Sequence, residues 1–142
     1  MKTYSQKETE VKRVWHILDA SNVAMGRVST VAASLLLGKG KPTVTNHTDG
    51  GDFVIIINVG AIKFTGNKAD QKLYQNHSGF PGGLRIRRLG DISKTEALSK
   101  SIRGMLPVNK LREARLARLK IYEGSEHNHS AQKPKMYKME TK

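Results

Sequence analysis

The hydrophobic pattern of the first sixty residues predicts a βαβ unit. Residues 14–18 form an apolar segment that ends at Asp19, as a buried strand would. Residues 26–37 place apolar side chains on one helical stripe, and residues 53–59 form a β-branched run typical of a strand covered on both faces. Strand, helix and strand in this order predict a parallel pair joined by a right-handed crossover.

The ends of this helix carry recognisable signals. Asn22 is a candidate N-cap just before the apolar stripe begins, and Gly38 is a candidate C-terminal stop. Residues 48–52 are rich in turn formers and lead directly into the second strand.

Patterns in the second half of the chain are shorter. Residues 62–64 suggest a short strand, whereas residues 75–92 contain four glycines and one proline and predict a long irregular loop. Ser93 with Glu96 forms a capping-box pattern, which predicts a helix from about residue 94 to 103 that Gly104 ends.

A further helix and strand follow. Asn109 is a candidate cap for a helix reaching about residue 119, and residues 120–122 read as a short strand. We expect one domain over residues 1–142, with a polar arm at 1–13, an α/β core at 14–122 that includes the basic loop 75–92, and an extended basic tail at 123–142. A chain of this length can bury a core without disulfides, and it contains no cysteine.

Charge changes this picture most. The chain has 25 Lys and Arg against 12 Asp and Glu, a net charge of +13. Residues 1–62 hold seven basic and five acidic side chains, whereas residues 63–142 hold eighteen basic and seven acidic ones. Such an excess repels itself unless an anionic partner neutralises it. Nucleic acid is the commonest partner of this kind, and a membrane surface is the main alternative.

The sequence lacks the motifs of several functional classes. The first thirteen residues resemble no signal peptide, and the longest apolar runs fall well short of the roughly 18 residues of a membrane span, so we expect a soluble cytoplasmic protein. Residues 38–41 lack the spacing of a phosphate-binding loop. Asp49 and Asp52 flank two glycines and suggest a turn rather than a metal site. We therefore expect no catalytic residue, cofactor, metal or small-molecule substrate.

Two segments carry chemistry suited to RNA. The stretch from Lys72 to Arg88 combines cations with glycine, Tyr74 and His77, which can approach phosphates and stack on unpaired bases. Helical spacing puts Arg112, Arg115 and Arg118 within one arc, which we expect to face RNA. On that expectation, replacing all three arginines by glutamate would leave the fold intact and block incorporation into a ribonucleoprotein.

Two alternatives remain open on these residues. A nucleotide-binding enzyme could use the same α/β core, although its phosphate loop and catalytic cluster are missing. A peripheral membrane protein would need a basic helix with bulky apolar anchors, and residues 111–120 contain no aromatic side chain.

Short segments from about residue 14 to residue 134 carry a recognisable pattern. They are residues 15–20, 25–27, 38–39, 51–54 with Asn58, 65–68, Tyr74, 77–79, 104–107, 119–122 and His127. In this order they resemble the bacterial-type L-thirteen family of large-subunit ribosomal proteins.

The resemblance implies a three-layer α/β/α fold around a mostly parallel four-stranded sheet. It also implies a structural role in the large ribosomal subunit, early joining during assembly, and contacts with large-subunit rRNA and neighbouring large-subunit proteins. Messenger RNA stays open as a further partner. We expect the RNA contacts to come from the arm, the loop, the C-terminal helices and the tail. They are Lys2, Tyr4, Lys39, Lys41, Lys68, Lys72, Tyr74, His77, Arg85, Arg87, Arg88, Arg103, Met105, Lys110, Arg112, Arg115, Arg118, Lys120, His127, His129, Lys133 and Lys135.

Overall fold

The computed structural model describes residues 4–139, so Lys2 lies outside the described residues. The strands are β1 (Trp15–Asp19), β2 (Phe53–Ile57), β3 (Leu73–His77), β4 (Leu84–Arg88), β5 (Leu119–Ile121) and β6 (Lys135–Met136). The α-helices are α1 (Met25–Leu37), α2 (Lys68–Gln71), α3 (Lys94–Met105) and α4 (Leu111–Ala117). Short 3-10 turns occur at Glu8–Glu10, Val59–Ala61, Leu89–Asp91 and Ser130–Gln132.

Four of the strands form one parallel sheet in the order β5-β2-β1-β6. β1 and β2 pair in parallel with Ile17 opposite Ile55, and α1 connects them, so the predicted βαβ unit is confirmed. The α/β class with a four-stranded parallel sheet is likewise confirmed.

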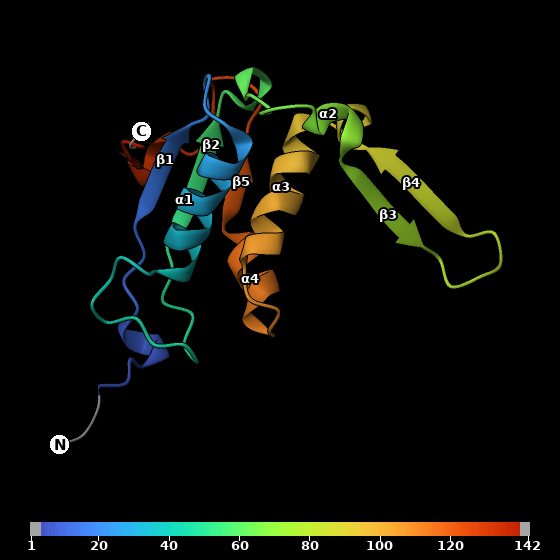
Figure 1. The fold of residues 1–142 in the computed structure, drawn as a ribbon. Coiled ribbons are helices and arrows are strands. Elements are labelled where there is room, and N and C mark those ends of the chain that lie inside the picture. The colour runs from blue at the N-terminus through green and yellow to red at the C-terminus, as the bar shows by residue number, and fades with distance from the viewer. Residues whose placement is uncertain (1–3, 140–142) are drawn as a thin grey trace.

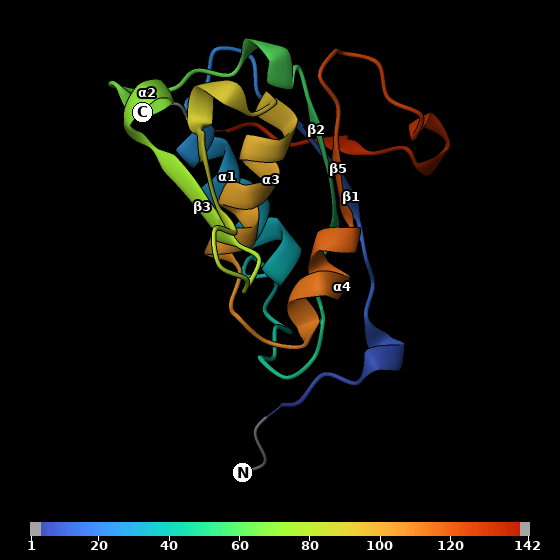
Figure 2. The same cartoon turned by 90° about the vertical axis from the view of Figure 1, so that its right-hand side faces the viewer.

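Alternate residues of β1 and β2 face opposite sides of the sheet, as the two-residue period of a strand requires. On one side Leu18 and Ile56 pack with α1 and α3 around side chains such as Leu98. On the other side Ile17, Ile55 and Ile57 form a smaller cluster covered by Trp15 and Tyr122. The C-terminal segment lies over that second side (Figure 2), where the His129 ring is 5.0 Å from the Trp15 ring.

The helix ends follow the sequence signals only in part. Gly38 adopts a left-handed conformation (φ 77°) directly after α1, which confirms the predicted stop. The predicted cap at Asn22 is wrong, because α1 begins at Met25 with Ala24 before it, and Asn22 lies in the preceding turn with φ 57°.

Ser93 caps α3 as predicted, accepting a hydrogen bond from the backbone N–H of Glu96 at 3.2 Å. Gly104 does not end this helix, which runs on to Met105. Pro107 explains the later end, since the residue before a proline disfavours helical backbone and Leu106 is already extended. The predicted cap at Asn109 lies one residue too early, because α4 begins at Leu111 with Lys110 as its N-cap. The Asn109 side-chain oxygen nevertheless accepts from the N–H of Leu111 at 3.2 Å.

Residues 75–92 are not the irregular loop that their glycines suggested. β3 and β4 pair as an antiparallel hairpin, which projects from the body of the molecule beyond α3 (Figure 1). The turn between them contains Gly79 and Gly82, both at positive φ. The predicted extended tail also contains regular structure, since β6 pairs in parallel with β1.

A candidate RNA-binding surface

The hairpin and α3 enclose a basic cleft, which we call the hairpin–α3 cleft. Strand register places Tyr74 opposite Arg87 and Asn76 opposite Arg85, so these four side chains share one face of the hairpin. The cleft has a volume of about 400 Å³. Its lining comprises Tyr74, Gln75, Asn76, Arg85, Arg87, Glu96, Lys100 and Arg103.

Positive charge dominates the hairpin–α3 cleft. Arg85, Arg87, Lys100 and Arg103 line it together with one acid, Glu96. The Lys100 ammonium lies 2.8 Å from the Glu96 carboxylate, and that hydrogen bond lowers the pKa of Glu96. Arg103 pairs with the exposed Glu113 at 3.1 Å. Exposed pairs of this kind are weak, so an incoming phosphate can replace them at little cost.

Tyr74 organises the cations at the base of the hairpin. The Lys72 and Lys100 ammonium groups lie 5.3 and 4.8 Å from the centre of its ring. Cation–π attraction of this kind holds both lysines near the cleft. The Tyr74 hydroxyl is buried and has no hydrogen-bond partner among the described residues.

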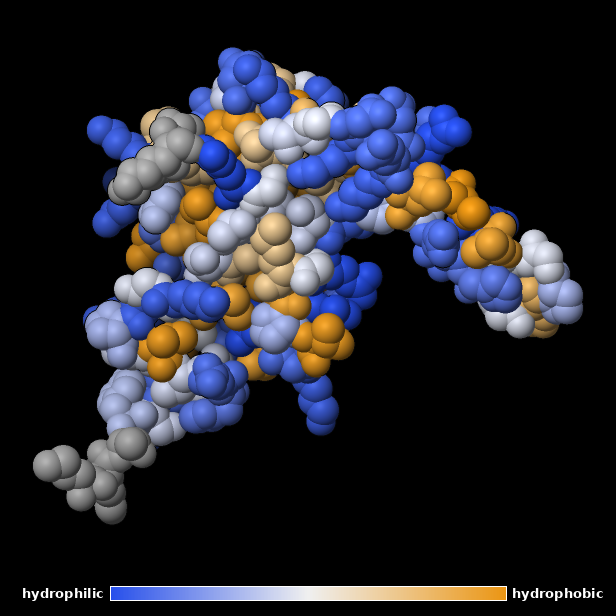
Figure 3. Space-filling view, in the orientation of Figure 1, coloured by the Kyte–Doolittle hydropathy of each residue, from blue (hydrophilic) through white to orange (hydrophobic). Residues whose placement is uncertain are grey.

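The outer surface of the hairpin is exposed on both faces. Leu84 and Ile86 are 54% and 52% exposed between the arginines of β4. Figure 3 shows this extension carrying hydrophilic and hydrophobic side chains side by side, away from the body of the molecule. A charged ribbon of this kind can reach a partner that the body does not touch.

A second group of predicted residues gathers beside the N-terminus of α1. Lys68, Lys72 and Met105 line a cavity of about 280 Å³ together with Lys63 and Phe64. The Lys68 ammonium donates to the Thr65 hydroxyl at 3.0 Å. This site adds Lys63 and Lys68 to Lys72 on the surface near the base of the hairpin.

Arg115 and Arg118 do not lie on the exposed arc that helical spacing suggested. They are 3% and 6% exposed, and both turn inward toward Asp49. Arg112 is only partly buried. The expectation that three glutamates would leave the fold intact is therefore wrong, because two of them would be buried next to a carboxylate.

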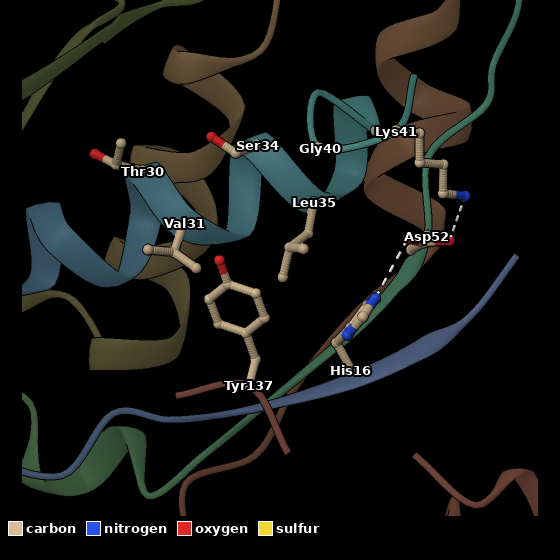
Figure 4. Close-up of a pocket in the computed structure, with 10 residues that line it drawn as sticks. His16, Thr30, Val31, Ser34, Leu35, Gly40, Lys41, Asp52 and Tyr137 are labelled. Atoms are coloured by element: carbon tan, nitrogen blue, oxygen red, sulfur yellow. Dashed lines mark hydrogen bonds and ion pairs between the residues drawn. The ribbon is translucent and has the colours of Figure 1, made fainter. Parts of the chain in front are cut away.

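Lys41 is likewise held within the structure. Its ammonium lies 2.6 Å from the Asp52 carboxylate and also donates to the backbone oxygens of Lys12 and Gly50. In Figure 4 Lys41 and His16 both point to Asp52, at one end of a cavity of about 400 Å³ that Tyr137 enters from the other side. The hydrogen bonds of Lys41 therefore fix the loop before β2.

Asp49 and Asp52 thus serve as internal anions in the turn that the sequence suggested. Within residues 4–139, no three or more acidic or histidine side chains cluster as a metal site would require. Burial alone would raise the pKa of Asp49, but the hydrogen bonds and charge of Arg118, with the charges of Arg115 and Arg13, lower it. Asp49 therefore stays ionised.

The other expected contacts are spread over the molecule. The His77 Nδ1 accepts from the N–H of Gly79, while Lys120 is partly buried in the edge strand β5. His127 and His129 are partly buried beside Tyr122. The remaining members of the expected set are exposed, and they are Tyr4, Lys39, Arg88, Lys110, Lys133 and Lys135.

Lys100 and Asn76 line the cleft but were not among the expected contacts. Lys100 could have been found, because it precedes Arg103 by three residues and so shares its helix face. Asn76 carries no signal of its own. No helix within the part of the chain that the structure describes is long and apolar enough to cross a bilayer.

Comparison with known proteins identifies the family. A family model described as ribosomal protein L13 matches residues 13–128. The chain is 49% identical over 137 residues to large ribosomal subunit protein uL13 of Frankia casuarinae, covering 94% of this chain and 93% of that protein. It is 49% identical over 140 residues to the protein of the same name from Listeria innocua, covering 96% and 97%. The chain therefore belongs to the ribosomal protein L13 family.

Proposed function

We propose that this chain is a structural constituent of the large ribosomal subunit and binds large-subunit rRNA through the hairpin–α3 cleft. Its relatives are named as proteins of that subunit, and the family match covers most of the chain. The role is structural and not enzymatic, and it is exercised in the ribosome. Neighbouring large-subunit proteins complete its surroundings.

The cleft's charge carries the proposal. Four cations converge there on a space that can admit an RNA backbone, and their carboxylate partners, Glu96 and Glu113, are exposed. Arginine donates paired hydrogen bonds that match phosphate geometry, and each phosphate neutralised releases counterions. Binding should therefore weaken steeply as salt rises.

The proposal also includes early joining during subunit assembly. Exposed cations lie on the hairpin, at Lys110 after α3 and at Lys133 in the tail. The hairpin, the helices and the C-terminal segment occupy different parts of the molecule (Figure 1), so on this proposal RNA approaches the chain from several directions. Such an arrangement forms most readily while the surrounding rRNA is still open. Pulse-labelled precursor particles should contain the chain before most other subunit proteins.

A charge reversal in the hairpin tests the binding surface. The double variant Arg85→Glu and Arg87→Glu should bind large-subunit rRNA more weakly. The slope of the logarithm of the binding constant against the logarithm of the salt concentration should become shallower by about 1.4 to 1.8. Lys7→Glu with Lys12→Glu makes the same change in charge at two exposed lysines that are outside the expected contact set and away from the cleft, and serves as the matched control. Equal binding by both double variants would refute the cleft as the RNA surface.

A further inference from the structure

Arg115 carries a buried positive charge that the chain itself compensates only in part. The Arg118 guanidinium donates to both oxygens of Asp49, so that carboxylate is already occupied. The Arg115 Nε lies 3.5 Å from the nearer oxygen of Asp49, beyond a good hydrogen bond. Among the described residues, its Nε and Nη1 have no hydrogen-bond partner. Buried donors without partners are costly, so this site favours an additional anion.

Arg115 forms part of the wall of a cavity distinct from the hairpin–α3 cleft. The cavity has a volume of about 320 Å³, and its lining contains no carboxylate. It lies where the loop after α1 meets the loop before α4. The lining residues are Leu37, Lys39, Val44, Thr45, Asn46, Pro107, Asn109 and Arg115.

The polar groups of this cavity are mainly donors. The Thr45 hydroxyl is buried without a hydrogen-bond partner among the described residues. The Asn109 amide oxygen already accepts from the N–H of Leu111, which leaves its NH₂ group to donate. Lys39 and Asn46 are exposed at the same cavity. Two cations and two amide groups together suit an oxyanion.

Three of the last four carbonyl oxygens at the nearby C-terminal end of α1 already accept hydrogen bonds. Its carbonyl oxygens would repel negative charge if they were free. However, the backbone oxygen of Ser34 accepts hydrogen bonds from the N–H groups of Gly38 and Lys39. The backbone oxygen of Leu35 accepts one from the N–H of Asp52. Leu36 accepts from the Arg118 guanidinium at 3.2 Å.

We propose that this cavity binds one phosphate group of the rRNA backbone, with Arg115 and Lys39 as its cations. The inference rests on the proposed RNA-binding function and adds a discrete subsite to it. A guanidinium held in place by packing offers donors without further loss of side-chain freedom. The subsite would fix the register of the RNA on the protein, while the cleft supplies most of the attraction.

Side-chain NMR of the full-length protein tests the anion site directly. Inorganic phosphate, added against chloride at equal ionic strength, should shift the Arg115 Nε–H resonance until the shift saturates. Asn46→Asp should abolish this response, because it places a carboxylate at the cavity. Asn22→Asp makes the same change at an exposed turn and should leave the response intact. Absence of any response in the unmodified chain would overturn the inference.

Measuring how the two variants bind large-subunit rRNA shows whether the cavity binds a phosphate of the RNA or free phosphate. Asn46→Asp should weaken binding by about tenfold near 150 mM salt and flatten the log–log salt dependence by about 1, whereas Asn22→Asp should change neither. A cavity that responds to inorganic phosphate but whose Asn46→Asp variant binds rRNA normally is a site for free anions, and the inference fails. The proposed function fails separately, if the unmodified chain does not bind rRNA.

Discussion

The Arg118 guanidinium holds the Asp49 carboxylate by hydrogen bonds to both of its oxygens, although the two residues are 69 positions apart in sequence. The same guanidinium donates to the backbone oxygens of Leu36 and Asp52. One side chain therefore joins the end of α4, the end of α1 and the loop that enters β2. This junction sets the position of α4 relative to the sheet.

Replacing Arg118 by methionine should destabilise the fold. The change removes the charge, keeps much of the volume, and leaves Asp49 without its hydrogen-bonded partner, with the Arg115 Nε at 3.5 Å as the remaining ion pair. Breaking a buried pair in this way costs about 3–5 kcal/mol. Urea unfolding would measure the loss. Arg88→Met, at an exposed position of the hairpin, is the matched control and should change stability by less than about 0.5 kcal/mol.

Stability should fall in acid because two aspartates have lowered pKa values in the folded state. Hydrogen bonds from Ser21 and Asn58 lower the pKa of Asp19, and Arg118 lowers that of Asp49 against the effect of burial. A lowered folded-state pKa contributes stability above the unfolded value of about 3.9, and this contribution is lost as pH falls through the folded pKa. The free energy of unfolding should thus drop below about pH 4.

The variant Asp49→Asn tests how much of this acid dependence comes from Asp49. It should lower stability near neutral pH and make the acid dependence shallower than in the unmodified chain, as measured by urea unfolding at several pH values. An unchanged acid dependence in this variant would mean that Asp49 is not held ionised by its arginines.

Two glycines should respond to alanine in opposite directions. A Cβ at Gly51 would lie 1.8 Å from the backbone oxygen of Leu36, so Gly51→Ala must displace the loop that Arg118 braces and should cost more than about 2 kcal/mol. A Cβ at Gly26 meets nothing within 4 Å in the first turn of α1, so Gly26→Ala should stabilise by about 0.5–1 kcal/mol. Thermal unfolding of both variants tests the close approach at Gly51, and similar melting temperatures would contradict it.

The Ser93 cap should contribute measurably to α3. Ser93→Ala removes the acceptor for the N–H of Glu96 and should cost about 1 kcal/mol. Ser125→Ala, at an exposed position outside any helix, should be neutral. Because α3 forms one wall of the hairpin–α3 cleft, the Ser93 variant should also bind rRNA slightly more weakly. An unchanged free energy of unfolding for Ser93→Ala, measured by chemical denaturation, would show that the cap is dispensable.

Patterns in the sequence predicted the elements that are buried in regular ways. The apolar runs gave β1, α1 and β2, because a strand or helix covered by the core repeats its hydrophobic residues at its own period. The hairpin was not predicted, because its strands are exposed on both faces and hold arginines where an ordinary strand would be apolar. The alternation of Leu84 and Ile86 with Arg85 and Arg87 was nevertheless present.

The sequence could not predict what surrounds Arg115 in α4 and Arg118 directly after it. Helical spacing tells which side chains share a face, but not what that face meets. The partner that draws Arg115 and Arg118 inward is Asp49, in a distant turn. β6 was missed for a related reason, since a strand of only two residues is defined by its pairing with β1 rather than by its own composition.

A photoreactive amino acid at Asn76, on the cleft face of the hairpin, tests the central claim most directly. Assembled large subunits that contain this variant would be irradiated and the crosslinked partner identified. The account predicts a crosslink to large-subunit rRNA. A crosslink to protein alone, in subunits that contain the variant at normal stoichiometry, would contradict it.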